Sequence, residues 1–147
     1  MALRLSTGMR TAMMNGTAFK TLMDGGVLDI YSGSQPASAD YVETGTKLAR
    51  ISTSAGTDAT CGLVFGTAAS GILPKSASDW KGVVSAAGVA GWFRFYGTGG
   101  TSGTSASEIR LDGNIGVSGA DLNLSHTSLK LSSTVTISTF NITQPAE

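Results

Sequence analysis

The sequence has little charge and no long hydrophobic run. Lys, Arg, Asp and Glu make up 14% of its 147 residues, and ten basic side chains balance ten acidic ones. Soluble domains carry roughly 25% charged residues. No basic cluster of the kind that binds nucleic acid occurs, and no run approaches the roughly 18 apolar residues of a membrane span. We therefore expect neither nucleic-acid nor membrane binding.

The chain has one cysteine and one histidine, so it offers few ways to build a reactive site. Cys61 cannot form an internal disulfide, and it opens a short apolar run, which favours a buried structural cysteine over a thiolate paired with His126. A zinc site would need both residues and carboxylates, without any paired-ligand motif. The glycine-rich tract at 97–107 lacks the Gly-Lys-Ser/Thr of a phosphate loop. We expect no catalytic residue, no metal, no cofactor and no enzymatic activity.

The low charge leaves two interpretations of the surface. It is either covered by neighbouring molecules or solvated through Ser and Thr side chains. A hydrophobic fraction of 41% is too high for a disordered chain, and 147 residues suffice for one domain with a core. The N-terminus has no continuous apolar core of a signal peptide, so we expect synthesis in a cytoplasm without cleavable export.

Helix signals are confined to residues 3–23. The Ser6-Thr7 pair is placed to cap a short helix that stops at Asn15-Gly16. Thr17 is placed to cap a second short helix that ends at Met23. We therefore divide a single domain, 1–147, into an N-terminal arm with short helices, 1–26, and a β-sandwich, 27–147.

After Gly26 the hydrophobic pattern changes to the alternation of β-strands. Seven or eight short strands separated by glycine-rich turns predict a mainly β protein, an antiparallel β-sandwich or jelly roll. The tract at 97–107 is expected to be a mobile loop. Asp112-Gly113 has the sequence of a tight turn and is expected to break the segment 107–125. The other strands are expected at 27–33, 46–53, 61–66, 80–86, 90–97 and 128–143.

The C-terminal strand pattern changes phase within 128–143. One face carries Leu129, Leu131, Val135 and Ile137. Phe140 and Ile142 then occupy the opposite phase, which a single-residue slip in a period-two pattern produces. The pattern predicts a β-bulge near Ser138-Thr139, or a strand that leaves one sheet and joins another.

The segment GWFRFYG, 91–97, concentrates aromatic rings on a predicted strand. Phe93 and Phe95 would face the core, and Trp92, Arg94 and Tyr96 would share the other face. Trp, Tyr and Arg are enriched at interface hot spots, so this second face is either a contact surface or is covered by the chain's own sheets. Both interpretations remain open at this stage.

Three segments together resemble a family of small virion proteins of tailed bacteriophages and prophages. They are VLDIYSGSQPASAD (27–40), GWFRFYG (91–97) with RLDGNIGVSGADLNLS (110–125), and STVTISTFNITQP (133–145). The family role that fits best is a capsid cement (decoration) protein. The resemblance implies a β-sandwich or jelly-roll body and a homo-oligomer, for which a dimer is favoured over a trimer. It also implies several major capsid protein subunits as partners on the capsid exterior.

Two surfaces are candidates for contact with the capsid. One is the N-terminal segment and the other is the aromatic face of 91–97. Their residues are Arg4, Met9, Met13, Met14, Trp92, Arg94 and Tyr96. Exposed methionines make adaptable contacts, although filling a core is their commoner role.

Two other functions are compatible with the sequence. The first is a tail or neck subunit of a bacteriophage, in which the glycine-rich loops would bridge subunits. The second is a carbohydrate-binding β-sandwich, because jelly rolls host lectins. Its sugar-stacking platform would be drawn from Trp80, Trp92, Tyr31 and Tyr41.

Overall fold

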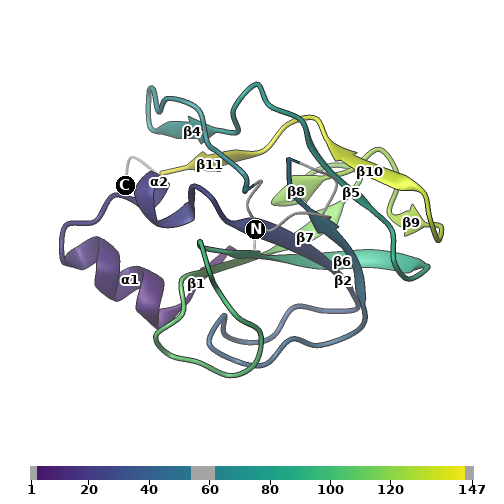
Figure 1. Cartoon of the computed structure of the whole chain (residues 1–147), viewed down its shortest axis with the longest axis horizontal. Helices are drawn as coiled ribbons and strands as arrows, with labels where there is room; N and C mark the ends of the chain where they lie inside the picture. The colour runs from purple at the N-terminus through teal and green to yellow at the C-terminus, as the bar shows by residue number, and fades with distance from the viewer. Residues whose placement is uncertain (1–2, 54–61, 145–147) are drawn as a thin grey trace.

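The computed structural model describes residues 3–53 and 62–144, and this part of the chain is mainly β with two short helices (Figure 1). The helices are α1 (Thr7–Met14) and α2 (Phe19–Met23). The strands are β1 (Arg4–Leu5), β2 (Val27–Ser32), β3 (Lys47–Ile51), β4 (Ile72–Pro74), β5 (Trp80–Val83), β6 (Gly88–Tyr96), β7 (Arg110–Gly116), β8 (Leu122–Asn123), β9 (Ser128–Leu129), β10 (Thr134–Ile137) and β11 (Asn141–Thr143).

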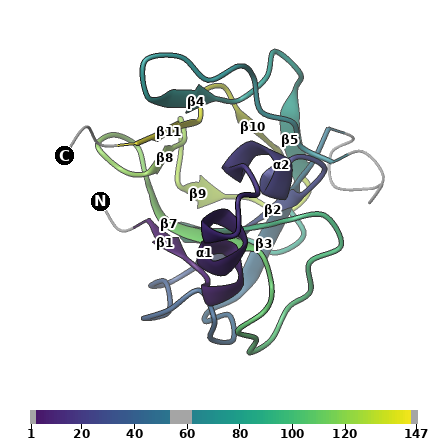
Figure 2. The ribbon, with the colours of Figure 1, turned by 90° about the vertical axis from the view of Figure 1, so that its left-hand side faces the viewer.

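The largest sheet has seven strands, five of which follow the order β1-β7-β6-β2-β3 with antiparallel neighbours. β8 joins β7 in parallel, and β9 pairs with the start of β6. Two-stranded sheets formed by β10-β5 and β11-β4 lie on one side of it, and the loops 33–46 and 97–109 lie on the other (Figures 1 and 2). The predicted mainly β, antiparallel fold is confirmed. The strand pairing does not confirm a jelly roll.

Aromatic side chains fill the space between the large sheet and the small sheets. Phe93 and Phe95 point inward from β6 and are fully buried, as the alternation along 91–97 predicts. Phe140 contacts Phe93 edge-on, with ring centroids 5.5 Å apart, and Trp80 of β5 contacts Phe95 of β6 in the same way at 5.9 Å. These contacts join the small sheets to the large one.

The N-terminal segment is part of the body and not an arm. β1 pairs with β7, and Met9 of α1 and Met23 of α2 are fully buried in the same hydrophobic cluster as the sheet residues. The Ser6 cap of α1 is confirmed, since its hydroxyl accepts the Met9 N–H at 3.1 Å. Thr17 does not cap α2, because that helix begins after Ala18 without a side-chain cap.

The tight turn expected at Asp112-Gly113 is wrong. β7 runs unbroken through both residues and pairs with β6 from Arg110 to Asn114. The glycine serves packing, because a Cβ at position 113 would lie 2.7 Å from ring atoms of Phe93. The aspartate is buried and bonded to Arg94. A strand-interior glycine often marks such a close approach.

The phase change in the C-terminal segment corresponds to a change of sheet. β10 pairs with β5 and β11 pairs with β4, so the prediction of a strand that leaves one sheet and joins another is confirmed. Leu131 does not share the buried face, since it is 62% exposed between β9 and β10. In the expected strand 61–66, Cys61 lies outside the described residues, and Leu63 and Phe65 form only isolated bridges.

Candidate functional site

The predicted contact face on β6 is covered by the chain's own loops. Trp92 and Arg94 are fully buried and Tyr96 is 2% exposed. The loops 33–46 and 97–109 lie together over this face of the sheet (Figure 2). The interpretation of Trp92, Arg94 and Tyr96 as a contact surface is therefore wrong. The alternative, coverage by the chain's own sheets, is correct in that the chain buries this face, but two loops cover it and not a second sheet.

Arg94 is the centre of a buried charge network beneath these loops. Its Nε and Nη2 each donate to one carboxylate oxygen of Asp112 at 2.7 Å. Its Nη1 donates to Glu43 at 2.8 Å and to the Tyr41 carbonyl at 2.9 Å. Burial alone would lower the pKa of Arg94, but the hydrogen bonds and charge of Asp112 raise it. The guanidinium is therefore a permanent structural cation.

Glu43 joins the two loops to the sheet. Its carboxylate accepts the Tyr96 hydroxyl at 2.7 Å and the Gly103 N–H at 3.0 Å. Burial alone would raise the pKa of Glu43, but the hydrogen bonds that it accepts hold it below its usual range. The tract at 97–107, expected to be mobile, is thus bonded to the body at Gly103.

The N-terminal candidates also differ from their expected exposure. Met9 is fully buried in the core, so its assignment to a contact surface is wrong. Arg4 donates to the Pro36 carbonyl and is half-buried, as is Met13. Met14 is 88% exposed. Of the seven candidates, Met14 alone presents a largely exposed side chain.

The other proposed sites also change with the structure. Trp80, Trp92 and Tyr31 are buried, so the sugar-stacking platform is wrong and only Tyr41 of its members is exposed. His126 is exposed and its Nδ1 lies 3.2 Å from the Ser125 hydroxyl. Within the part of the chain that the structure describes, no three His, Cys, Asp or Glu side chains gather as metal ligands.

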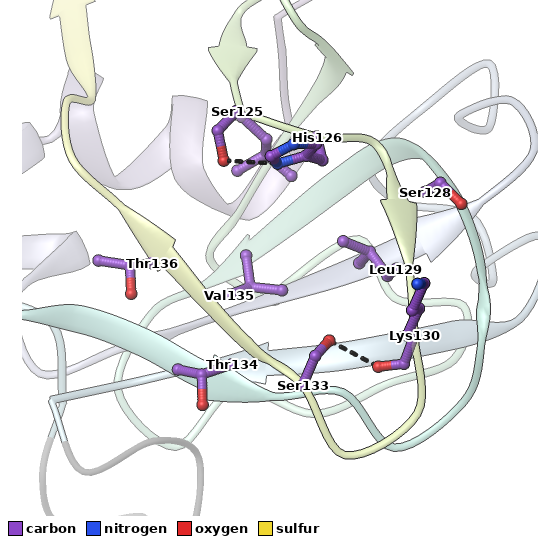
Figure 3. Close-up of a pocket in the computed structure, with 10 residues that line it drawn as sticks. Ser125, His126, Ser128, Leu129, Lys130, Ser133, Thr134, Val135 and Thr136 are labelled. Atoms are coloured by element: carbon purple, nitrogen blue, oxygen red, sulfur yellow. Dashed lines mark hydrogen bonds between the residues drawn. The ribbon is translucent and has the colours of Figure 1, made fainter.

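A surface cleft lies where the consecutive strands β9 and β10 diverge (Figure 3). The two strands are joined by a turn, which the Ser133 hydroxyl closes by donating to the Lys130 carbonyl at 2.6 Å. Beyond the turn, β9 pairs with β6 and β10 pairs with β5, so the strands separate. This β9–β10 cleft encloses about 300 Å³. Its lining residues are Leu124, Ser125, His126, Ser128, Leu129, Lys130, Ser133, Thr134, Val135 and Thr136.

The β9–β10 cleft combines a buried aliphatic floor with polar walls. Leu124, Leu129 and Val135 are each less than 8% exposed, and the last two extend into the space between the strands (Figure 3). Hydroxyl groups and Lys130 surround them. A concave site with an apolar base and a few polar groups is typical of a binding surface.

Exposed aliphatic side chains border this cleft. Val83 lies opposite Thr134 in the β5-β10 register, and Val89 lies opposite Ser128 in the β6-β9 register. Directly opposite residues on one sheet face are close neighbours. Val83, Val89 and Leu131 are 43%, 61% and 62% exposed, and we call these three residues the aliphatic rim.

The sequence analysis missed the cleft and its rim. The tail looked like one long strand, and Leu131 fitted its apolar face. The signal that could have found the site is Ser132-Ser133, two polar residues in succession between Leu131 and Val135, which interrupts the alternation. The divergence of the two strands depends on their partners β5 and β6 and cannot be seen in the local pattern.

Comparisons of the chain with protein-family models, with curated protein sequences and with solved structures give no match. Neither of the helices in the described ranges, 3–53 and 62–144, is long and apolar enough to cross a membrane.

Proposed function

We propose that this chain is a bacteriophage virion structural protein, and specifically a capsid cement protein. In this role it binds several major capsid protein subunits on the capsid exterior and stabilises the head. It acts as a homo-oligomer that bridges neighbouring subunits, and we favour a dimer over a trimer. Several modest contacts joined in one oligomer bind through high effective concentration.

The observation that supports this proposal is the β9–β10 cleft with its aliphatic rim. Val83, Val89 and Leu131 expose apolar surface around a concave site with a buried aliphatic floor. Covering such a surface requires little desolvation of charge, because Lys130 is the single Lys, Arg, Asp or Glu among the lining residues. A contact of this composition suits a binding protein that remains on its partner.

The buried network around Arg94 supports a mechanical role for the body. The ion pair between Arg94 and Asp112 is 0% exposed on both sides, and Glu43 connects it to both covering loops. A satisfied buried polar network holds its members in one geometry. A cement protein needs such a rigid body, since contacts made on a yielding body would not restrain the subunits that it bridges.

Co-sedimentation of the purified protein with expanded capsid shells that lack it tests the proposal. We expect saturable binding at a fixed number per capsid subunit and a higher melting temperature of the shell. No binding to shells, together with the protein in the tail fraction of intact particles, would contradict the cement role and transfer the protein to the tail or neck.

A further inference from the structure

We propose that the β9–β10 cleft receives an extended segment of another protein chain, which pairs as an added strand with the free edge of β10. Under the proposed function, this segment belongs to a major capsid protein subunit. The identity of that partner rests on the proposed function. The mode of binding rests on the backbone geometry of the cleft alone.

The hydrogen-bond register of β10 leaves one of its edges without a partner. Val84, next to β5, donates its N–H to the Ser133 carbonyl at 2.8 Å and accepts the Ser132 N–H at 2.9 Å, so a hydrogen-bonded pair with one extra residue on the β10 side ends the ladder at Val84. Such pairs alternate along an antiparallel ladder. Val135 and Ile137 therefore direct their N–H and C=O groups toward β5. Those of Thr134 and Thr136 point to the opposite edge, where β10 has no strand neighbour among the described residues.

The register of β9 places a second free edge on the other side of the cleft. Ala90 donates its N–H to the Thr127 carbonyl at 2.8 Å, and Gly88 pairs with Leu129. By the same alternation, the main chain of Ser128 points away from β6. Ser128 and Thr134 both line the cleft, so the two free edges border the same space.

The cleft offers an extended segment both main-chain partners and side-chain contacts. Thr134 and Thr136 supply two N–H donors and two carbonyl acceptors, which match the ladder of an incoming strand. Alternate side chains of that strand would point down onto Leu129 and Val135, so small apolar residues suit these positions. A small anion could accept only from the N–H donors, and neither an anion nor a sugar repeats donors and acceptors at the spacing of a β-strand. The geometry therefore favours a polypeptide over those ligands.

A proline at position 136 tests the edge directly. Proline removes the outward N–H of Thr136 but none of the hydrogen bonds between β10 and β5, and prolines are tolerated at strand edges. Thr136→Val is the matched control, because it changes the same side chain and retains the N–H. If Thr136→Pro lowers the melting temperature of the protein, an amide-to-ester replacement at residue 136 removes the same donor without the ring.

Each variant is measured against two probes, expanded capsid shells and a displayed library of short random peptides. The backbone amide signals of Thr134 and Thr136 in the nitrogen-15-labelled protein report where a selected peptide binds. We expect Thr136→Val to bind shells as the wild type does and Thr136→Pro to bind about tenfold more weakly. We also expect selected peptides to alternate apolar and polar residues and to shift both amide signals.

The outcomes separate the inference from the proposed function. Equal shell binding by all three proteins would overturn the added strand and leave the cement role standing. If neither the wild type nor either variant binds shells, the cement role is contradicted, and peptide binding then tests the added strand. Peptides that shift the Thr134 and Thr136 amides and lose affinity for Thr136→Pro would retain it. Failure to select any peptide, or shifts confined to other residues, would overturn it.

Discussion

Single residues on β6 show how one strand supplies both the core and a buried charge network. Phe93 and Phe95 pack between the sheets, while Trp92, Arg94 and Tyr96 lie beneath the loops 33–46 and 97–109. Burying a guanidinium is tolerated only when its hydrogen bonds and charge are matched. Asp112, Glu43 and the Tyr41 carbonyl provide that match, and so they hold two loops against one sheet.

Removal of one partner of the buried ion pair is expected to be strongly destabilising. Asp112→Ala leaves Arg94 charged and fully buried, and we expect a loss of about 3–5 kcal/mol in the free energy of unfolding measured in urea. Asp79→Ala is the control, because Asp79 is 75% exposed in its pair with Lys81 and should cost less than about 1 kcal/mol. Equal losses in the two variants would contradict a structural role for the network.

Tyr31 is expected to make the protein sensitive to alkaline pH. Burial raises the pKa of Tyr31 from 10.0 to about 12, and the charges of Asp29 and Glu43 add to the increase. A raised folded-state pKa gives stability that is fully present below pH 10 and is lost as the pH rises toward 12. The free energy of unfolding should fall by about 1.4 kcal/mol per pH unit from this residue in that window.

Urea unfolding at a series of pH values between 8 and 12 measures this slope. Tyr31→Phe should make the fall shallower, since the ionising group is removed, although Tyr96 also loses a hydroxyl neighbour at 3.2 Å. Tyr41→Phe, at a 55% exposed ring, is the matched control for the removal of a tyrosine hydroxyl. An unchanged slope in Tyr31→Phe would assign the alkaline sensitivity to other groups.

Among the elements, α1 and β7 depend on each other through Ser6. The buried Ser6 hydroxyl accepts the N–H of Met9 in α1 and the N–H of Arg110 in β7, at 3.1 and 3.0 Å. It also donates to the Glu108 carbonyl at 2.7 Å. A helix cap predicted from the local sequence is thus also a joint between the helix and the large sheet.

Substitution of Ser6 by alanine should therefore cost more than the loss of an ordinary cap. A cap contributes about 1 kcal/mol, and the buried Arg110 N–H loses its side-chain acceptor, so we expect a loss of about 2 kcal/mol or more in urea unfolding. Thr17→Ala provides the comparison, because α2 has no side-chain cap and the change should stay within about 0.5 kcal/mol. A loss of only about 1 kcal/mol in Ser6→Ala would show that Ser6 serves as a cap alone, and a loss as small as that of Thr17→Ala would contradict both roles.

The course of β7 through Gly113 depends on the absence of a side chain there. In Gly113→Ala the new methyl group would lie 2.7 Å from the Phe93 ring and 3.0 Å from Leu3. We expect a loss of about 1–3 kcal/mol from overpacking, seen as a lower melting temperature. Gly66→Ala meets its nearest neighbours at 3.4 Å and should melt close to the wild type. A wild-type melting temperature in Gly113→Ala would mean that Phe93 moves aside freely.

Across the whole molecule, a few charged side chains are buried while apolar side chains border an open cleft. Arg94, Asp112 and Arg110 are buried, whereas Val89 and Leu131 are more than 60% exposed. Exposed apolar side chains of this size are unfavourable for the solubility of a freely diffusing domain. Their exposure is consistent with the proposed binding of the protein to a capsid surface.

Charges introduced on the aliphatic rim should weaken shell binding without unfolding the protein. The variants Val89→Glu and Leu131→Glu are expected to bind expanded capsid shells about tenfold more weakly or worse, since each would bury an unpaired carboxylate. Val117→Glu is the matched control, because Val117 is 63% exposed outside the rim and the cleft lining. If all three variants bind shells as the wild type does, the aliphatic rim is not the capsid contact.

The sequence by itself determined the features that depend on neighbouring residues. The Ser6 cap, the alternation of Trp92 to Tyr96 and the phase change before Phe140 are all local, and each is confirmed. Period and capping chemistry act within a few residues, so a single sequence contains them. The mainly β, antiparallel fold follows from the same signals.

Only the tertiary structure decided which surfaces are open. From the sequence, Trp92 and Arg94 have the composition of an interface, but in the structure the loops 33–46 and 97–109 cover them. Asp112-Gly113 has the sequence of a turn, but Asp112 pairs with Arg94 and Gly113 makes room for the Phe93 ring within a continuous strand. The β9–β10 cleft exists because consecutive strands take partners from different parts of the chain. Burial and strand pairing join residues far apart in sequence, and therefore no local pattern contains them.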